Sequence, residues 1–312
     1  MRAVAADVDA ACRDTGFFYA VGHDIPSGVV SRLDTEARAF FALHDDEKAA
    51  IAMSKGGRAW RGWFPLGGEL TSGKPDMKEG LYFGEELPAG DPRPLHGPNQ
   101  FPDRPAGLRD AVLTYIDAVT DLGHRVLRAM AIGLELDEQW FAEHLTAEPT
   151  VLFRIFRYPP LPDADERWSV GEHTDYGLVT LLAQDDSGGL EVRGPDGWVA
   201  APPVPDSFVV NLGDMLERMT GGRYRSTPHR VRNSHTADRL SFPLFLDPGW
   251  DAEVLPVPGM ETASADADAE DRWDGASVHD WSGTYGDYLL AKVSKVFPAL
   301  REAVLPESSA SP

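Results

Sequence analysis

The stretch HTDYGLVTLLAQDDSGGLEV, residues 173–192, combines side chains that bind metals with two β-prone runs. Residues 178–184 are mostly apolar, and residues 185–189 (DDSGG) form a strong turn signal before the next run begins at Leu190. Short apolar runs bounded by Gly, Asp and Ser clusters are typical of strands joined by turns. The stretch therefore predicts two strands that follow a possible pair of metal ligands.

The same alternation of β-prone runs and turns extends over residues 151–248 and predicts an all-β barrel or sandwich. The runs are VLFRIFRY (151–158), LVTLLAQ (178–184), LEVRG (190–194), WVAAP (198–202), SFVVNLG (207–213), HRVRN (229–233) and LSFPLFLDP (240–248). We expect the chemistry of the protein to lie inside this β region.

Helical spacing of apolar residues predicts helices on both sides of the β region. These helices are expected over about 4–15, 26–43, 106–133 and 284–297, with Pro298 stopping the last one. A short strand is expected over 17–21. The segment 54–105 is rich in Gly and Pro and predicts irregular structure with a strand near 80–84.

The expected architecture is one structural unit with a mainly β core and flanking helices. Its parts are an N-terminal helical and loop region (1–105), a central helix followed by the β catalytic core from about residue 150 (106–250), and an acidic loop with a C-terminal helix (251–312).

The chain of 312 residues carries a net charge of −21, from 50 acidic and 29 basic residues. Such an acidic composition argues against binding to nucleic acid or to an anionic membrane, since both need basic patches. Part of the excess lies in residues 261–274, which we expect to form a solvated loop. We draw no catalytic conclusion from the acidity.

The single cysteine, Cys12, excludes an intrachain disulfide and a zinc site of several cysteines. The N-terminus has no apolar core of signal-peptide length, and no stretch approaches about 20 apolar residues. We therefore expect a cytoplasmic protein without a membrane span. Its oligomeric state is not indicated by the sequence.

His173 and Asp175 are the clearest candidate metal ligands. In an extended strand, residues i and i+2 point to the same side, so the imidazole and the carboxylate could meet one ion. His229, which opens a β-prone run 54 residues after Asp175, is the best third ligand. Two histidines and one carboxylate suit iron(II), because they leave positions open for O2 and a co-substrate.

The His-x-Asp pattern alone is weak, since His44 and Asp46 repeat it in a segment that favours a helix start. The copy at 173–175 differs by its Gly and Tyr-Gly flanks and by the apolar strand that follows. The other histidines have no comparable setting and are expected to be surface or structural residues; they are His23, His96, His124, His144, His235 and His279.

Arg239 and Ser241 follow His229 by ten and twelve residues and would share one face of a strand. Arginine is a planar, bidentate carboxylate clamp, and serine adds a hydroxyl donor. A small dicarboxylate that chelated iron at one end could pair with Arg239 at the other.

The chain resembles the isopenicillin N synthase-like branch of the iron(II)/2-oxoglutarate-dependent dioxygenases. The matching segments are residues 173–192, FVVNLGDMLERMTGGRYRSTPHRV (208–231), RLSFPLFLDP (239–248), GFFYAVGHDIP (16–26) and TYGDYLLAKVSKVFP (284–298). The family's usual opening strand, an IPVID-like sequence, is absent, which suggests a truncated or misassigned N-terminus.

The resemblance implies a distorted double-stranded β-helix, or jelly roll, flanked by helices. It implies that His173, Asp175 and His229 bind Fe(II), and that Arg239 and Ser241, assisted by Tyr158, hold 2-oxoglutarate. The expected reaction consumes O2, oxidises a small molecule by hydroxylation or a related C–H oxidation, and releases succinate and CO2. Many plant members carry Asn where this chain has Phe156, which leaves one polar contact to the co-substrate in doubt.

Other functions remain open at this stage. An isopenicillin N synthase-like oxidase would use no 2-oxoglutarate, and an ethylene-forming enzyme would fragment it. An inactive binding module on the same fold is a candidate of another class, and a zinc hydrolase would leave the Arg-x-Ser spacing unexplained.

The substrate pocket is the least defined part of the sequence. Arg61 or Lys78 could meet an anionic substrate, and Tyr82 and Phe245 are further candidate contacts. The competing interpretation places the aromatic residues in the core and the charges at the surface.

Overall fold

The computed structural model describes residues 2–71, 73–161, 167–233, 236–261, 263 and 277–297. The helices are α1 (Arg2–Asp14), α2 (Ser27–Phe41), α3 (Asp45–Lys48), α4 (Leu108–Gly133), α5 (Trp140–His144), α6 (Asp214–Met219) and α7 (Tyr285–Val296). His235, Pro298 and most of the acidic stretch 261–274 lie outside the described residues.

The strands form two main sheets and one small hairpin. They are β1 (Phe17–Val21), β2 (Gly62–Phe64), β3 (Leu70–Thr71), β4 (Lys74–Pro75), β5 (Glu79–Gly84), β6 (Thr150–Tyr158), β7 (Val170–His173), β8 (Val179–Gln184), β9 (Leu190–Gly194), β10 (Gly197–Ala200), β11 (Ser207–Leu212), β12 (His229–Val231) and β13 (Arg239–Asp247).

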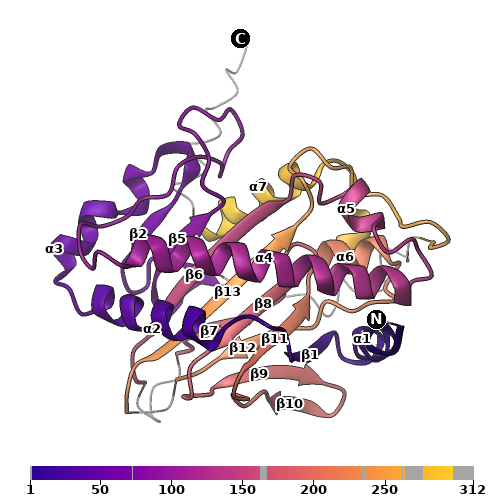
Figure 1. The fold of residues 1–312 in the computed structure, drawn as a ribbon, viewed down its shortest axis with the longest axis horizontal. Coiled ribbons are helices and arrows are strands. Elements are labelled where there is room, and N and C mark those ends of the chain that lie inside the picture. The colour runs from indigo at the N-terminus through magenta and orange to yellow at the C-terminus, as the bar shows by residue number, and fades with distance from the viewer. Residues whose placement is uncertain are drawn as a thin grey trace.

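The large sheet has the order β1-β11-β8-β13-β6-β5-β2, the second has the order β10-β9-β12-β7, and β3 pairs with β4. All these neighbouring strands are antiparallel. Figure 1 shows this β core with α4 crossing one face of the large sheet. A mainly antiparallel jelly roll with flanking helices confirms the predicted fold class.

The alternation of side chains along β13 separates the core from an internal cavity. Phe242 and Leu246 face α4: the Phe242 and Tyr115 ring centroids are 6.4 Å apart, and a Cβ on Gly123 would lie 2.7 Å from Leu246. The odd-numbered residues of β13 line the cavity instead. Because strand side chains alternate, one strand serves both the helix-covered core and the cavity.

The segment 54–105 contains more regular structure than the sequence predicts. The strand expected near 80–84 is β5, which pairs with β2, and the same segment forms the separate β3–β4 hairpin. β2 and β5 extend the large sheet by pairing outward from β6. β2, β3 and β4 are only two or three residues long, so local propensity does not reveal them.

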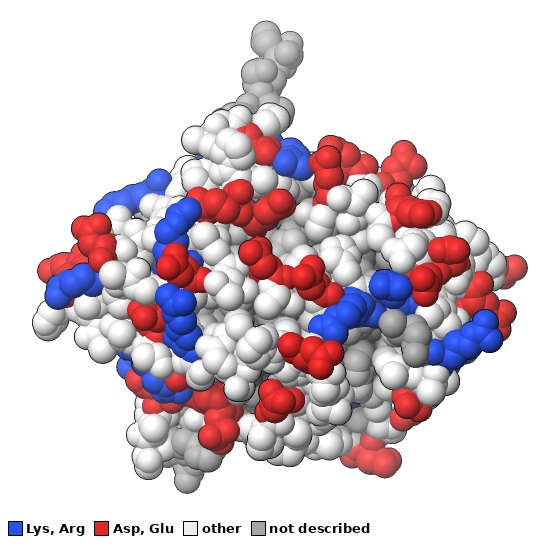
Figure 2. Space-filling model, viewed as in Figure 1, with Lys and Arg blue, Asp and Glu red and all other residues white. Residues whose placement is uncertain are grey.

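No described helix is long and apolar enough to cross a membrane. On the face shown in Figure 2, acidic side chains are interspersed with fewer basic ones, in keeping with the net charge of −21.

Gly213, between β11 and α6, is required by a close approach of two main chains. A Cβ on Gly213 would lie 2.4 Å from the Gly177 carbonyl oxygen. We expect Gly213→Ala to lower the free energy of unfolding by about 1–3 kcal/mol, because a main chain cannot easily move away. Denaturant unfolding measures this.

Gly28→Ala is the matched control, since nothing lies within 4 Å of a Cβ there. Gly28 lies in the first turn of α2, where alanine favours the helix by up to about 1 kcal/mol. Equal unfolding midpoints for the two variants would contradict the packing argument at Gly213.

Candidate active site

The three predicted ligands meet between β7, β12 and the turn after β7. His173 ends β7, His229 begins β12, and the two residues are direct partners in the β7–β12 pairing. Their ring centroids are 4.2 Å apart. With Asp175, they offer one ligand atom each, and these three atoms lie within 4.8 Å of one another.

Asp175 is positioned by contacts other than the strand geometry that the sequence predicts. β7 ends at His173, so Asp175 does not share a strand with it, and the expected i, i+2 geometry is wrong. Asp175 instead forms a parallel bridge with Gly213, and its carbonyl accepts a hydrogen bond from the Asp214 N–H at 2.8 Å. The turn is therefore held by the end of β11 and the start of α6.

Main-chain carbonyls orient the two imidazoles. The Nδ1 atom of His173 lies 2.8 Å from the Gly171 oxygen, and the Nδ1 atom of His229 lies 3.2 Å from the Thr227 oxygen. The Nε2 atoms of these histidines lie 3.9 and 3.8 Å from the Asp175 Oδ1 atom. Both Nε2 atoms consequently face the carboxylate.

Two donors fix the carboxylate of Asp175. Its Oδ2 atom accepts hydrogen bonds from the Thr180 hydroxyl at 2.5 Å and from the Asn211 amide at 2.7 Å. Thr180 and Asn211 are direct partners in the β8–β11 pairing. Because Oδ2 is occupied, Oδ1 is left to face the two histidines.

The protonation states suit metal binding. Burial, together with the neighbouring His173, lowers the pKa of His229 to about 4, and burial also lowers the pKa of His173. Burial alone would raise the pKa of Asp175, but His229 and His173 outweigh it and the pKa is lowered. At neutral pH the site thus offers two neutral imidazoles and one carboxylate, which are the forms that ligate metals.

The spacing also fits one ion. Donor atoms at about 2.0–2.2 Å from a common metal lie no more than about 4.4 Å apart, and both His–Asp distances fall within this limit. Two histidines and one carboxylate with open positions are the ligand set of non-haem iron(II) oxygenases.

Arg239 forms a second polar centre. Its side chain is fully buried, Nε donates to the Gly188 carbonyl at 2.6 Å, and Nη2 donates to the Gln184 side chain at 3.0 Å. Nη1 is buried and has no hydrogen-bond partner among the described residues. A buried donor without a partner is costly, so this nitrogen indicates a place for an acceptor from outside the chain.

Ser241 and Tyr158, the other two residues predicted to hold the co-substrate, lie beside Arg239. Arg239 and Ser241 share one face of β13, and Tyr158 pairs with Arg239 across β6. The Ser241 and Tyr158 hydroxyls lie 3.0 Å apart. The Arg239 guanidinium carbon lies 4.8 Å from the centre of the Tyr158 ring.

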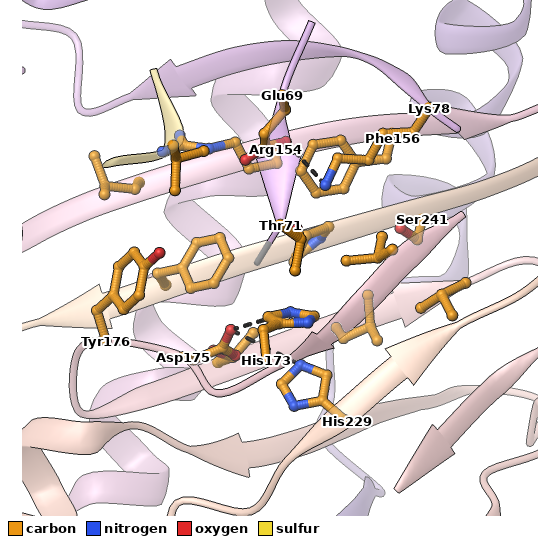
Figure 3. A pocket seen from close by; sticks show the side chains of 18 of the residues that line it. Glu69, Thr71, Lys78, Arg154, Phe156, His173, Asp175, Tyr176, His229 and Ser241 are labelled. Atoms are coloured by element: carbon orange, nitrogen blue, oxygen red, sulfur yellow. Dashed lines mark hydrogen bonds and ion pairs between the residues drawn. The ribbon is translucent and has the colours of Figure 1, made fainter. Parts of the chain in front are cut away.

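One cavity of about 150 Å³ joins both centres. Its lining includes all six residues predicted to hold the metal or the co-substrate, namely His173, Asp175, His229, Arg239, Ser241 and Tyr158. Figure 3 shows the three ligands on one side of this cavity, with Ser241 further along it. The structure therefore brings the two predicted centres together.

Lys78, Tyr82 and Phe245, three of the residues predicted to contact the substrate, also line the cavity. The Lys78 Nζ atom, however, lies 2.9 Å from carboxylate oxygens of both Asp76 and Glu69. Burial alone would lower the pKa of Lys78, but these two carboxylates outweigh it and raise the pKa. The charge of Lys78 is therefore balanced by the protein itself.

Arg61 does not line this cavity, contrary to its predicted contact with the substrate. Its guanidinium is buried and donates to the carbonyls of Glu85, Gly97 and Leu95 and to the Asn99 side chain. These contacts tie β2 to the loop after β5. We therefore correct the role of Arg61 to a structural one.

The competing His-x-Asp pair, His44 and Asp46, does not line the cavity. His44 directly precedes α3, and its main-chain N–H donates to Glu47. His23, His96, His124, His144 and His279 are likewise absent from the lining of the cavity.

Sequence reasoning missed several residues that shape the site: Glu69, Arg154, Thr180, Asn211 and Asp247. Asn211 and Thr180 do leave a signal, because each is a polar residue within an apolar strand. The other three are recognisable only once the strands are paired.

Two neutral histidines, a carboxylate and a buried arginine in one jelly-roll cavity define the class of non-haem iron oxygenases. Two family descriptions match the sequence: "non-haem dioxygenase in morphine synthesis N-terminal" over residues 1–104 and "2OG-Fe(II) oxygenase superfamily" over residues 149–248.

Similar proteins agree with these matches. The "Probable iron/ascorbate oxidoreductase" of Dictyostelium discoideum is 44% identical over 330 residues, covering 97% of this chain and 91% of the relative. A homoarginine-6-hydroxylase of Arabidopsis thaliana is 36% identical, with 94% and 90% covered. The crystal structure of a full-length Neurospora crassa protein in complex with alpha-KG (2-oxoglutarate) and thymine superposes with a TM-score of 0.77 at 26% identity, covering 93% and 90%.

The chain therefore belongs to the 2OG-Fe(II) oxygenase superfamily. It is a non-haem iron(II)- and 2-oxoglutarate-dependent dioxygenase, as the sequence predicts.

Asp247, at the end of β13, is a buried carboxyl in the cavity wall. Its Oδ1 atom accepts from the Leu178 N–H at 3.2 Å, and its Oδ2 atom accepts from the Tyr285 hydroxyl. Burial raises the pKa of Asp247 to about 7, although Tyr285 and Leu178 favour the ionised form. The group therefore links the turn that carries Asp175 to helix α7.

This pKa predicts a pH-dependent stability. In the unfolded chain Asp247 loses its proton near pH 4, whereas in the folded chain it keeps the proton up to about pH 7. Ionisation therefore favours the unfolded chain, and the free energy of unfolding falls as the pH rises from about 4 to about 7. Asp247→Asn removes this dependence. We expect the difference in free energy of unfolding, variant minus wild type, to rise by roughly 2 kcal/mol between pH 5.5 and 7.

Urea unfolding at several pH values above the pI of about 4.7 measures the difference. A difference between the two proteins that stays constant over this range would contradict the raised pKa of Asp247.

Proposed function

We propose that His173, Asp175 and His229 hold Fe(II), and that Arg239, with Ser241 and Tyr158, holds the distal carboxylate of 2-oxoglutarate. The observation that carries this proposal is the buried, unpartnered Nη1 of Arg239 in the same cavity as the three ligands. A carboxylate oxygen would satisfy this nitrogen with a charge-assisted hydrogen bond.

Iron and 2-oxoglutarate, when bound, activate O2 with release of succinate and CO2 and oxidise a substrate C–H bond. The protein orients the ligands through Thr180 and Asn211 on Asp175 and through main-chain carbonyls on the histidines. Such partners fix ring orientation and raise ligand basicity.

Phe156 gives the co-substrate region an apolar wall. Many relatives are expected to carry Asn at this position, but here the ring lines the cavity and lies 6.1 Å from the Tyr158 ring. The polar contact in doubt is thus replaced by aromatic surface, and Arg239, Ser241 and Tyr158 remain as the polar contacts.

We further propose that the substrate is a small molecule and that the reaction is a hydroxylation. A cavity of about 150 Å³ between two sheets suits a compact ligand, and the Arabidopsis relative is named as a hydroxylase. The absence of nucleic-acid and membrane partners and the cytoplasmic location stay predictions from composition.

We expect His173→Ala and Asp175→Ala each to abolish iron-dependent turnover of 2-oxoglutarate, because two ligands hold iron too weakly. Anaerobic titration of iron with 2-oxoglutarate measures the same loss through the weak visible band of the chelate. His144→Ala is the control, since this exposed ring stacks only on Trp140. Full turnover in either ligand variant would refute the assignment.

Arg239→Gln should keep iron but weaken 2-oxoglutarate binding by at least about tenfold, since a charged hydrogen bond contributes about 1.5–3 kcal/mol. Oxygen uptake with and without 2-oxoglutarate measures this. Uptake that needs no 2-oxoglutarate in the wild type would favour the isopenicillin N synthase-like alternative.

Thr180→Val preserves shape but removes the hydroxyl that orients Asp175. We expect iron affinity to fall by about 10–100-fold, as for other partners of metal ligands. Metal titration monitored by equilibrium dialysis tests this, with Thr35→Val on the exposed side of α2 as the control. Unchanged iron affinity would show that Thr180 does not support the site.

A further inference from the structure

Arg154 lies in the cavity, away from the centre proposed for 2-oxoglutarate. Alternate residues of β6 line the cavity, and Arg154 is four residues from Tyr158 on the same face. At about 3.3–3.4 Å per residue, the two positions are about 13 Å apart along the strand. A carboxylate held by Arg239 and Tyr158 is therefore beyond the reach of Arg154.

Aromatic rings and main-chain carbonyls hold the Arg154 guanidinium in place. Its central carbon lies 3.4 Å from the centre of the Tyr82 ring, which is its direct partner across β5, and 5.8 Å from that of Phe245. Its Nη1 atom donates to the Phe83 and Phe153 carbonyls at 3.3 and 3.2 Å. The planar group is thus fixed by neutral partners.

Among the described residues, no carboxylate oxygen lies within 4.0 Å of a nitrogen of Arg154. The neighbouring acids are engaged elsewhere: Glu69 accepts from Tyr82 at 2.5 Å and lies 2.9 Å from Lys78. Asp247 accepts from Tyr285. The protein therefore leaves the charge of Arg154 without a direct counter-ion.

Arg61, which lies behind the cavity wall, adds to this positive potential. Arg61 and Arg154 both border a small secondary void beside Tyr82. Burial and the nearby Arg154 lower the pKa of Arg61 to about 10, although Glu86, Glu85 and Asp91 act in the opposite direction. An anion at Arg154 would offset the effect of Arg154 on Arg61.

We propose that Arg154 binds a carboxylate of the primary substrate. The inference rests on the proposed function, because it places the substrate in the part of the same cavity that iron and 2-oxoglutarate would leave open. Figure 3 shows Arg154 on the side of the cavity opposite His173, Asp175 and His229, so an anion held there would direct the rest of the substrate toward the metal ligands.

The substrate class is a small carboxylic acid with an apolar body. A planar guanidinium matches a planar carboxylate through two parallel hydrogen bonds. The adjoining wall is largely apolar, formed by Phe245, by Leu289 and Val293 within α7, and by Phe297 just after α7. These surfaces suit the hydrocarbon part of such an acid.

The test compares carboxylic acids with their own primary amides. The probes are 3-phenylpropionate, 4-phenylbutyrate, octanoate and L-phenylalanine, each titrated against its amide into the enzyme loaded anaerobically with Fe(II) and 2-oxoglutarate. Calorimetry and the change in the chelate absorption report binding. We expect at least one acid to bind the wild type about tenfold or more tightly than its amide.

Arg154→Met should remove this preference while the chelate absorption of the loaded enzyme persists, and Arg154→Lys should restore part of it. Arg193→Met, an exposed arginine on β9, is the matched control and should keep the preference. If Arg154→Met does not fold, the comparison of acids with amides on the wild type and on Arg154→Lys still tests whether Arg154 binds the carboxylate.

Two negative outcomes are distinguishable. A wild type that forms no chelate with iron and 2-oxoglutarate contradicts the proposed function. A wild type that forms the chelate but binds no acid in preference to its amide, or an Arg154→Met variant that retains the preference, overturns the role of Arg154 alone.

Discussion

The site depends on the main-chain contact between residues 175–178 and residues 213–215. The Gly213 N–H donates to the Leu178 carbonyl at 2.9 Å, and the Asp214 N–H donates to the Asp175 carbonyl at 2.8 Å. β7 has ended before Asp175, which forms only an isolated bridge with Gly213. The approach is possible because residue 213 is glycine, since a Cβ there would overlap the Gly177 main chain. Gly177 leaves room for the Asp247 carboxylate, which a Cβ at that position would overlap.

This contact explains why one carboxylate can be both buried and well oriented. It places Asp175 against the β8–β11 pairing, where Thr180 and Asn211 stand opposite each other and converge on the Oδ2 atom. The same turn is fixed from the other side by Asp247, through the Leu178 N–H. The Asp175 side chain is thus oriented by hydrogen bonds from neighbouring strands, although Asp175 itself lies outside a strand.

Period-two patterns made much of the fold and the site predictable. Arg239 and Ser241 share a face of β13, and His229 begins β12, as their alternation and turn signals indicate. Asp175 lies beside His173 and His229 as predicted, but beyond the end of β7 rather than within the strand. The balance of charge on Lys78 could not be predicted, because Glu69 lies across a hairpin whose short strands have no periodicity.

Among the cations that line the cavity, the charge of the partners determines whether the cation stays available to an incoming anion. Lys78 contacts two carboxylates, which balance its charge. These ion pairs hold the cavity wall together. Arg239 and Arg154 are anchored chiefly by carbonyl oxygens and aromatic rings, which fix a guanidinium without neutralising it.

Neutral anchors alone do not define a binding residue, because Arg61 also has them and lies outside the main cavity. The combination that matters is a fixed guanidinium, neutral partners and access to the cavity. Desolvation strengthens the attraction of such a group for an incoming anion. By this criterion Arg239 and Arg154 are the two proposed carboxylate partners, and they lie at separate places along the face that β6 presents to the cavity.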